Sequence, residues 1–283
     1  MFPNRFDYHR PKTMQDAIAL LVKYKDDAKL LAGGQSLVSM LKLRLANPTC
    51  LVDLAGLAGL SYIREEGNKI AIGAMTTYAE IKDSKLLQAK CPLLPKAAAV
   101  VGDVQVRNRG TIGGSIAHAD PAGDVPAAIL ALDAEITATG PKGDRWLQAA
   151  DFFEGMYATG LAVDEILTEI RVPVQGSARS AYMKAARRPS DFAIVGMAAY
   201  IKLAADMTCE SIAIAVTGVT DKPYRASAAE AKLKGTKLDA ASIEAASPLV
   251  TENIDLVGNM HGSADFRRHL AGVYLGRVIA AAQ

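Results

Sequence analysis

Short apolar runs alternate with one amphipathic stripe over the first 55 residues of the chain. Residues 6–8, 29–32 and 50–54 have the length and composition typical of strands. Between the first two runs, Thr13 stands where a helix would begin, and Asp16 follows three residues later as in a capping box. The helix carries apolar residues at helical spacing: Ala17, Leu20, Leu21 and Tyr24. This pattern predicts a small unit of strands and helices.

The second strand of that unit runs directly into a glycine pair. Gly33 and Gly34 follow residues 29–32, and Ser36 is expected to cap the next helix, which residues 47–48 (Asn-Pro) end. Glycine permits backbone angles that other residues avoid, and it allows a ligand to approach the main chain closely. A strand, a glycine turn and a helix start in this order aim N–H groups at a phosphate.

The middle of the chain has a different pattern of apolar and polar residues. Residues 61–65 and 69–73 flank Glu-Gly-Asn, which predicts a β-hairpin. Thr77 and Glu80 form a capping-box pattern that opens a helix, and residues 97–101 form a further apolar helix. We therefore expect this region to mix antiparallel strands with short helices.

A second glycine pair, Gly113 and Gly114, lies beyond these helices. Hydroxyl side chains flank it on both sides, at Thr111 and Ser115, and we expect it to form a loop after a strand-like apolar run. Asp124 follows in a turn, as the expected cap of an apolar helix. Each pair alone would indicate an ordinary turn, but two such loops in one chain suggest a grip on one elongated, phosphate-bearing ligand.

The C-terminal third has the pattern of a separate domain. A boundary is expected at residues 174–177, followed by a meander of three strands at 180–184, 193–203 and 211–218. Two helices are expected after the meander, the last over about 265–281. Its predicted inward face consists of Leu270, Val273, Tyr274 and Val278.

Composition excludes several classes of protein. The 283 residues are half hydrophobic and 22% charged with a net charge of +2, which is typical of a globular protein and makes a nucleic-acid partner unexpected. No apolar stretch reaches the roughly 20 residues of a membrane span, and the first residues carry no apolar signal segment. We therefore expect a cytoplasmic protein without a membrane span.

Metal ligands are absent from the sequence pattern. The three cysteines and four histidines are scattered without ligand spacing, so we expect no metal site and no iron–sulfur cluster in this chain. The chain also lacks a Walker A motif, a nucleophile–base–acid triad and a full G-x-G-x-x-G after a strand. A diphosphate held by neutral groups remains, which fits a dinucleotide cofactor that carries its own reactive ring.

Five segments, in this order, resemble one known family. They are Ala-Gly-Gly-Gln-Ser at 32–36, Ile-Gly-Ala-Met-Thr-Thr at 72–77, Thr-Ile-Gly-Gly-Ser at 111–115, Asp-Pro-Ala-Gly-Asp at 120–124 and Lys-Ala-Ala-Arg-Arg at 184–188. The chain resembles, over essentially its whole length, the FAD-binding medium subunit of the xanthine dehydrogenase and carbon monoxide dehydrogenase family of molybdenum hydroxylases. The likeness is strongest to the carbon monoxide dehydrogenase type.

The resemblance implies an α+β fold in two parts. Residues 1–175 would form an FAD-binding domain of the vanillyl-alcohol-oxidase (PCMH) type, with subdomains at about 1–55 and 56–175. Residues 176–283 would form an α+β C-terminal domain built from the antiparallel meander and its helices.

The same resemblance implies a set of FAD-binding residues and no catalytic residue in this chain. The segment 32–36 would wrap the diphosphate, Asp124 would accept hydrogen bonds from ribose hydroxyls, and Lys184 would stabilise negative charge on the reduced ring. Asp124 as a plain helix cap and His118 as a structural residue remain open. The full expected set is Ala32, Gly33, Gly34, Gln35, Ser36, Gly110, Thr111, Gly113, Gly114, Ser115, His118, Asp124, Leu167, Lys184 and Phe192.

In such a family the chain is one member of a heterotrimer, expected as a dimer of heterotrimers. A small subunit would hold [2Fe–2S] clusters and a large subunit a molybdopterin cytosine dinucleotide. Electrons would pass through the clusters and FAD to an external acceptor. Two alternatives are a free-standing FAD-dependent reductase of the same fold and a structural subunit with a vestigial flavin site. The sequence leaves the hydroxylated substrate and the acceptor open, with quinone, cytochrome, NAD and oxygen all compatible.

Overall fold

A parallel three-stranded sheet forms the N-terminal end of the molecule in the computed structural model, which describes residues 2–283. Its strands lie in the order β1 (Asp7–His9), β3 (Cys50–Asp53), β2 (Ala28–Leu31). Helix α1 (Met14–Tyr24) begins as predicted, because the Thr13 hydroxyl oxygen accepts the N–H of Asp16. Helix α2 (Leu37–Lys42) follows the first glycine pair. Short 3₁₀ turns lie at Lys25–Asp27 and Leu54–Gly56.

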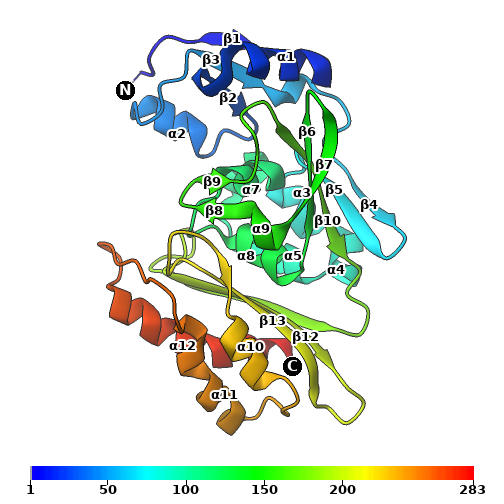
Figure 1. The fold of residues 1–283 in the computed structure, drawn as a ribbon, viewed down its shortest axis with the longest axis vertical. Helices are drawn as coiled ribbons and strands as arrows, with labels where there is room; N and C mark the ends of the chain where they lie inside the picture. Colours follow the sequence, from blue (N-terminus) through cyan, green and yellow to red (C-terminus); the bar gives the residue numbers. More distant parts are fainter. Residues whose placement is uncertain (1) are drawn as a thin grey trace.

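An antiparallel five-stranded sheet occupies the middle of the molecule (Figure 1). Its strands lie in the order β4 (Ile63–Glu66), β5 (Lys69–Gly73), β10 (Ile166–Pro173), β6 (Glu135–Gly140), β7 (Gly143–Gln148). Ile72, Ile170 and Ile136 stand side by side on its three central strands and are fully buried. The hairpin prediction is confirmed by β4 and β5, and this row of isoleucines forms the centre of the core.

Six short helices pack around this sheet. The predicted capping box is confirmed at α3, where Thr77 and Glu80 satisfy each other's N–H groups. The other predicted helix, at 97–101, lies earlier than expected, at Leu93–Ala99. The helices are α3 (Tyr78–Asp83), α4 (Lys85–Lys90), α5 (Leu93–Ala99), α6 (Val104–Arg109), α7 (Ile112–His118) and α8 (Asp124–Ala131), with α9 (Ala149–Phe152) and the small hairpin β8 (Phe153–Gly155) and β9 (Ala158–Thr159) nearby.

The second glycine pair does not form the predicted loop. Gly113 and Gly114 lie in the first turn of α7, and the segment before them is helix α6 rather than a strand. Thr111 caps α7 by accepting the N–H of Gly114. A loop was predicted because two adjacent glycines lower helix propensity. In the structure, packing against neighbouring segments stabilises α7 in spite of them.

The C-terminal part is a four-stranded antiparallel meander backed by helices. Strands β11 (Arg179–Ala185), β12 (Val195–Leu203) and β13 (Cys209–Thr217) confirm the three predicted strands, and β14 (Tyr224–Arg225) adds an edge strand too short to signal itself. Three α-helices follow instead of the predicted two, because α10 and α11 are separate. They are α10 (Ser227–Leu233), α11 (Ala240–Ala246) and α12 (Ala264–Ala282), with a 3₁₀ turn at Ser247–Thr251.

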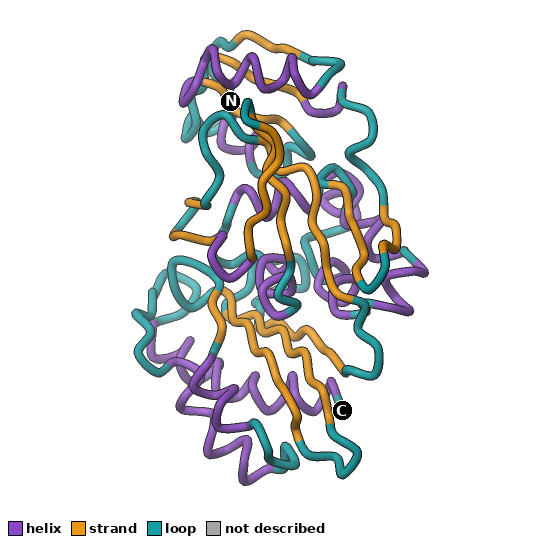
Figure 2. The backbone as a smooth tube through the Cα atoms, turned by 45° about the vertical axis from the view of Figure 1, so that its right-hand side comes forward, coloured by secondary structure: helices purple, strands orange, loops and turns teal. Residues whose placement is uncertain are grey.

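The C-terminal sheet is covered on both faces, as Figures 1 and 2 show. Along β12, Ala198 joins the core shared with the middle subdomain, whereas its neighbours Met197 and Ala199 join the core beneath α12. Helix α8 lies against the first of these faces and all eight of its residues are buried. Apart from Asp124, this helix consists of apolar residues, which is typical of a helix buried between two layers.

Neither a membrane-spanning helix nor a metal cluster occurs among residues 2–283. Within this range, no helix has the length and hydropathy that a membrane span requires. Over the same residues, no group of three or more His, Cys, Asp or Glu side chains is arranged to hold a metal ion. Cys50, Cys91 and Cys209 are all buried as free thiols.

Candidate FAD site

The two glycine pairs, 80 positions apart in sequence, lie against each other. A Cβ atom at Gly33 would stand 2.0 Å from the carbonyl oxygen of Arg109 and 2.9 Å from the Cα of Gly110. A Cβ at Gly114 would stand 3.5 Å from the Cβ of Ala32. Only glycine at position 33 allows this approach, so the structure brings together the two segments that the sequence pattern paired.

The first pair forms a true loop with backbone available to a ligand. Gly34 has φ +75°, a conformation that side chains other than glycine rarely adopt. Ser36 occupies the N-cap position of α2, but its hydroxyl makes no capping hydrogen bond, contrary to prediction, because its backbone is already helical with φ −102° and ψ −53°. The first N–H groups of a helix have no partner inside the helix. The loop therefore presents N–H groups beside an unengaged hydroxyl.

The second pair plays a different role from the first. The N–H of Gly113 donates to the carbonyl of Ala74 at 2.9 Å, and that of Gly114 to the Thr111 hydroxyl oxygen at 3.2 Å. A Cβ at Gly113 would lie 2.5 Å from the Cβ of Ala74. These N–H groups are used within the chain, so the pair holds α7 close to the end of β5 rather than offering donors as the first loop does.

Tyr78 packs on the second glycine segment, and the charges of Asp124 and Asp120 act on its phenol group. Its ring packs on Gly110, where a Cβ would lie 2.7 Å from Cε2. Burial raises the pKa of the Tyr78 phenol; the Ser115 hydroxyl opposes the rise, and Asp124 and Asp120 add to it. The sequence pattern did not single out Tyr78, since its place in the capping box marked it only as an apolar helix residue.

Asp124 and Lys184 form a buried ion pair between helix α8 and the C-terminal sheet. Their side chains are each 5% exposed, and Lys184 Nζ lies 3.1 Å from Asp124 Oδ2. Lys184 also donates to the carbonyls of Val100 at 2.7 Å and Asp191 at 3.0 Å. The Tyr182 hydroxyl donates to the other oxygen of Asp124 at 2.6 Å. The two predicted residues therefore meet, as partners of each other.

The cap prediction for Asp124 is wrong. The N-cap of α8 is Gly123, and Asp124 is the first helical residue, with its side chain turned toward Lys184 and Tyr182 instead of the helix N–H groups. Burial raises the pKa of the Asp124 carboxyl, while the charge of Lys184 and the Tyr182 hydroxyl oppose this rise. Both carboxylate oxygens are engaged, and contact with a ribose stays a prediction.

A cleft of about 420 Å³ opens beside this ion pair, between the middle part of the chain and the C-terminal part. Phe192 lies in it with 65% of its surface exposed. Asp191 Oδ2 is buried and accepts no hydrogen bond, although Arg187 Nε lies 3.7 Å away. Asp191 lines the cleft and was not among the residues predicted from the sequence, because a single aspartate after two arginines and a proline is typical of a surface turn.

Of the fifteen predicted site residues, only Phe192 lines this cleft, and His118 and Leu167 belong neither to the glycine contact nor to the ion pair. His118 ends α7, and its ring centroid lies 4.9 Å from that of Tyr157. Burial lowers the pKa of His118, and the Asp120 charge opposes this. Leu167 is 4% exposed on β10, in the core against which α7 packs. Both therefore support the site's framework in this structure, and their contact with FAD stays a prediction.

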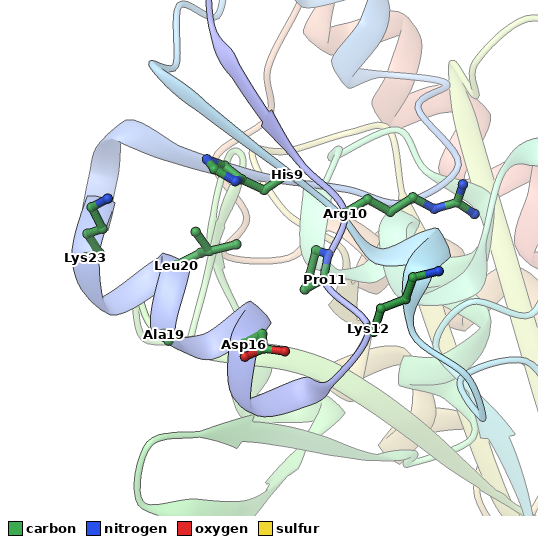
Figure 3. Close-up of a pocket in the computed structure, with 8 residues that line it drawn as sticks. All are labelled: His9, Arg10, Pro11, Lys12, Asp16, Ala19, Leu20 and Lys23. Atoms are coloured by element: carbon green, nitrogen blue, oxygen red, sulfur yellow. The ribbon is translucent and has the colours of Figure 1, made fainter.

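A separate shallow hollow of about 530 Å³ lies on the N-terminal sheet unit (Figure 3). It shares no lining residue with the diglycine segments or the cleft. Figure 3 shows Lys23 close to His9 at one end and Lys12 at the other. The hollow is open, and three of its eight lining residues, Arg10, Lys12 and Lys23, have long cationic side chains, which is typical of a solvated surface.

Comparison with known families agrees with this geometry. Residues 4–175 match the model described as FAD binding domain in molybdopterin dehydrogenase, and residues 180–282 match the CO dehydrogenase flavoprotein C-terminal domain. The carbon monoxide dehydrogenase medium chain of Hydrogenophaga pseudoflava is 40% identical over 100% of this chain and 98% of its own length. This chain is an FAD-binding medium subunit of the molybdenum hydroxylase family.

Other medium chains extend the likeness beyond carbon monoxide dehydrogenase. The glyceraldehyde dehydrogenase medium chain of Sulfolobus acidocaldarius is 38% identical, with 96% of each chain covered. Among solved structures, a carbon monoxide dehydrogenase of H. pseudoflava superposes with a TM-score of 0.97 at 42% identity, covering 100% of this medium subunit and 98% of the other chain. Quinoline 2-oxidoreductase of Pseudomonas putida 86 reaches a TM-score of 0.93 at 35% identity, with 100% and 98% coverage.

These findings confirm the predicted family, the α+β fold and FAD as the cofactor of this medium subunit. The chain's own residues fit that cofactor in two places. The glycine loop, with Gly34 at φ +75°, presents backbone N–H groups beside the Ser36 hydroxyl, and the buried Oδ2 of Asp191, which accepts no hydrogen bond, offers an acceptor beside the cleft. FAD, with a diphosphate in the middle of the molecule and an N–H donor on its flavin ring, can use both kinds of group.

Proposed function

We propose that this medium subunit carries electrons from the [2Fe–2S] clusters of a partner chain, through its FAD, to an external acceptor. The observation that carries the proposal is the contact between the two glycine segments, where Gly34 takes φ +75° and position 33 admits no Cβ. When bound, FAD supplies the electron exchange, because its ring accepts and releases electrons. No residue of this chain is assigned a catalytic role.

The chain's own contribution is to hold and orient the cofactor. The N–H groups of residues 33–36 and the Ser36 hydroxyl would hold the diphosphate. Gly113 keeps α7 packed behind that loop. Asp191 Oδ2 would accept an N–H of the ring, and Phe192 would cover the ring beside the cleft. The ammonium group of Lys184 is held by the backbone carbonyls of Val100 and Asp191, and its positive charge would favour a negatively charged reduced ring.

The proposed assembly follows the relatives, which are named as medium chains or complex subunits. The partners would be a small iron–sulfur subunit and a large subunit with a molybdopterin cytosine dinucleotide, in a cytoplasmic dimer of heterotrimers. A free-standing reductase is disfavoured because these relatives are parts of complexes. A vestigial site is disfavoured because the loop keeps a glycine at its positive φ.

FAD binding by the purified chain tests the site directly. Gly34→Val should lower FAD affinity by roughly 100-fold, because a β-branched residue is strained at φ +75° and meets Val38. Gly114→Val should also lose FAD, since its Cβ would lie 2.8 Å from the Thr111 hydroxyl oxygen. Flavin absorbance after desalting and a fluorescence titration measure both.

The matched control is Gly67→Val. Gly67 has φ +64° in the β4–β5 turn, and a Cβ there would meet no atom within 4 Å, so the variant carries the same backbone strain away from the site. We expect this variant to retain FAD. A colourless wild-type chain that cannot be reconstituted with FAD, or wild-type flavin content in Gly34→Val, contradicts the proposal.

A further inference from the structure

Arg267 of helix α12 is a buried arginine in the lining of the cleft that Asp191 and Phe192 also line. Only 3% of its surface is exposed. Arginine is rarely buried so completely unless an opposite charge pairs with it. The proposed function assigns Arg267 no role, so its burial beside the cleft needs a separate explanation.

The four hydrogen-bond acceptors of the Arg267 guanidinium are all neutral. Nη1 donates to the carbonyl of Ile194 at 2.6 Å and to that of Gly218. Nη2 donates to the amide oxygen of Asn259 at 2.7 Å, and Nε donates to the carbonyl of Gly262 at 3.4 Å. In the part of the chain that the structure describes, no carboxylate oxygen lies within 4.0 Å of the guanidinium. Burial lowers the pKa of Arg267, but an arginine side chain stays protonated in proteins, so its full charge remains.

These contacts join three segments of the cleft wall. Ile194 follows Phe192 in the β11–β12 turn, and Gly218 comes directly after β13. Asn259 lies in the loop before α12, where its side-chain oxygen also accepts the N–H of His261 at 2.9 Å. Ile194, Gly218 and Asn259 all line the cleft. The rigid fork of donors on one guanidinium therefore fixes three segments at once.

The other charged side chains at the cleft have partners of opposite charge. Arg187 Nε lies 3.7 Å from Asp191 Oδ2, and both residues line the cleft. Farther inside, Asp124 offsets the charge of Lys184. Among the residues that line the cleft, Arg267 is thus left as a cation without a carboxylate partner. An uncompensated charge that is shielded from water acts more strongly on its surroundings than a paired or solvated one.

We propose that Arg267 is a positioning residue that holds the cleft walls together and supplies the positive charge that makes bound FAD easier to reduce. The proposal rests on the function proposed above, which places the flavin ring beside Asp191 and Phe192. A negatively charged reduced ring carries one more negative charge than the oxidised ring, so an uncompensated cation beside the cleft favours the reduced form. Reduction of the ring in this subunit is thereby promoted.

A redox titration of the FAD-loaded medium subunit tests this charge. Arg267→Gln should lower the preference for reduced over oxidised FAD by roughly tenfold, which equals a fall of about 30 mV in the midpoint potential of a two-electron couple. Arg268→Gln is the matched control on the same helix. The Arg268 side chain is 58% exposed and pairs with Asp265, so solvent already screens its charge and the midpoint potential should not change.

A second variant separates the charge of Arg267 from its part in holding the fold. Asn259→Asp keeps an acceptor for Nη2 of Arg267 and for the N–H of His261, but it gives the guanidinium a carboxylate partner. It should lower the preference for reduced FAD by roughly threefold or more, without lowering the thermal midpoint of unfolding. A purely structural Arg267 would leave the potential unchanged. Asn253→Asp, at an exposed position of the same loop outside the cleft lining, is its control.

A wild-type midpoint potential in Asn259→Asp, or in a folded Arg267→Gln, would overturn the proposal. An equal fall in potential in the control variants would also overturn it, because overall charge would then explain the effect. If Arg267→Gln does not fold, Asn259→Asp and Asn253→Asp decide the question. A wild-type chain that does not bind FAD would instead contradict the proposed function, so the two failures are distinguishable.

Discussion

Lys184 combines near-complete burial with three acceptors, only one of which is charged. Its ammonium group donates to Asp124 and to two backbone carbonyls, so the carboxylate is its single source of charge compensation. A buried ion pair contributes little net stability, but removing one partner leaves an uncompensated charge behind. The pair thus matters most when it is broken.

We predict that Lys184→Met lowers the free energy of unfolding by about 3–5 kcal/mol at neutral pH. Burial already raises the pKa of Asp124, and loss of Lys184 raises it further. A folded-state pKa above the unfolded one means that the folded protein binds more protons, so stability rises as the pH falls through the folded pKa. Urea unfolding at pH 7.5 and pH 5 should show the deficit shrinking at the lower pH.

The control for this prediction is the double variant Lys184→Met/Asp124→Asn. It removes both charges and should be less destabilised than the sum of the two single variants. A Lys184→Met deficit that is the same at both pH values would contradict the assignment of Asp124 as its partner.

The family resemblance predicted FAD contacts for Asp124 and Lys184, but nothing in the sequence predicted that their side chains pair with each other. Lys184 lies 60 positions from Asp124 and 84 from Val100, and no local pattern encodes contacts at that separation. A lysine near a strand end is usually exposed, and an aspartate after glycine is typical of a helix cap. The burial that joins them arises only when α8 packs on the C-terminal sheet.

At the scale of elements, α7 is the helix that local sequence would not form alone. It has seven residues and two adjacent glycines, and its first turn is held by contacts with Ala74 and Thr111. Helices with strong local signals were predicted correctly, such as those opened by Thr13 and Thr77. A helix cap depends on residues a few positions apart, so it can be predicted from the sequence. The formation of α7 depends instead on packing against distant segments.

We predict that Gly113→Ala destabilises the protein by about 1–3 kcal/mol, although alanine favours helices, because its Cβ would lie 2.5 Å from that of Ala74. Gly276→Ala in α12 is the matched control, since its Cβ would lie 3.5 Å from Ile243, an ordinary contact. The control should be neutral or more stable by up to about 1 kcal/mol. Denaturant midpoints measure both, and equal shifts would show that α7 tolerates the added methyl group.

Over the whole molecule, the FAD-binding part and the C-terminal part share a core. Ala198, Ala213 and Ala215 of the C-terminal sheet are buried with the residues of the middle subdomain. The Thr217 hydroxyl and the Gly218 N–H both bond to the Pro121 carbonyl, at 2.6 Å and 2.7 Å. Two parts joined in this way are expected to unfold together.

The single tryptophan of the chain tests this coupling, because Trp146 lies on β7 of the middle sheet. Leu275→Ala, at a fully buried residue of α12, should destabilise the C-terminal core by about 2–5 kcal/mol. We predict that the midpoint temperature of unfolding falls by the same amount whether unfolding is followed by Trp146 fluorescence or by helical circular dichroism. An unchanged fluorescence transition would show that the two parts unfold independently.

The buried lysine also sets the order of events during synthesis. A nascent chain completes its N-terminal parts first. Here Val100 and Asp124 are synthesised before Lys184, which donates to both of them. Helix α8 is likewise synthesised before β12 and β13, the strands on which it packs, and β13 ends only at Thr217. The ribosome must therefore release most of the C-terminal sheet before the cleft has both walls. We therefore expect FAD to bind only after the ribosome has translated β13.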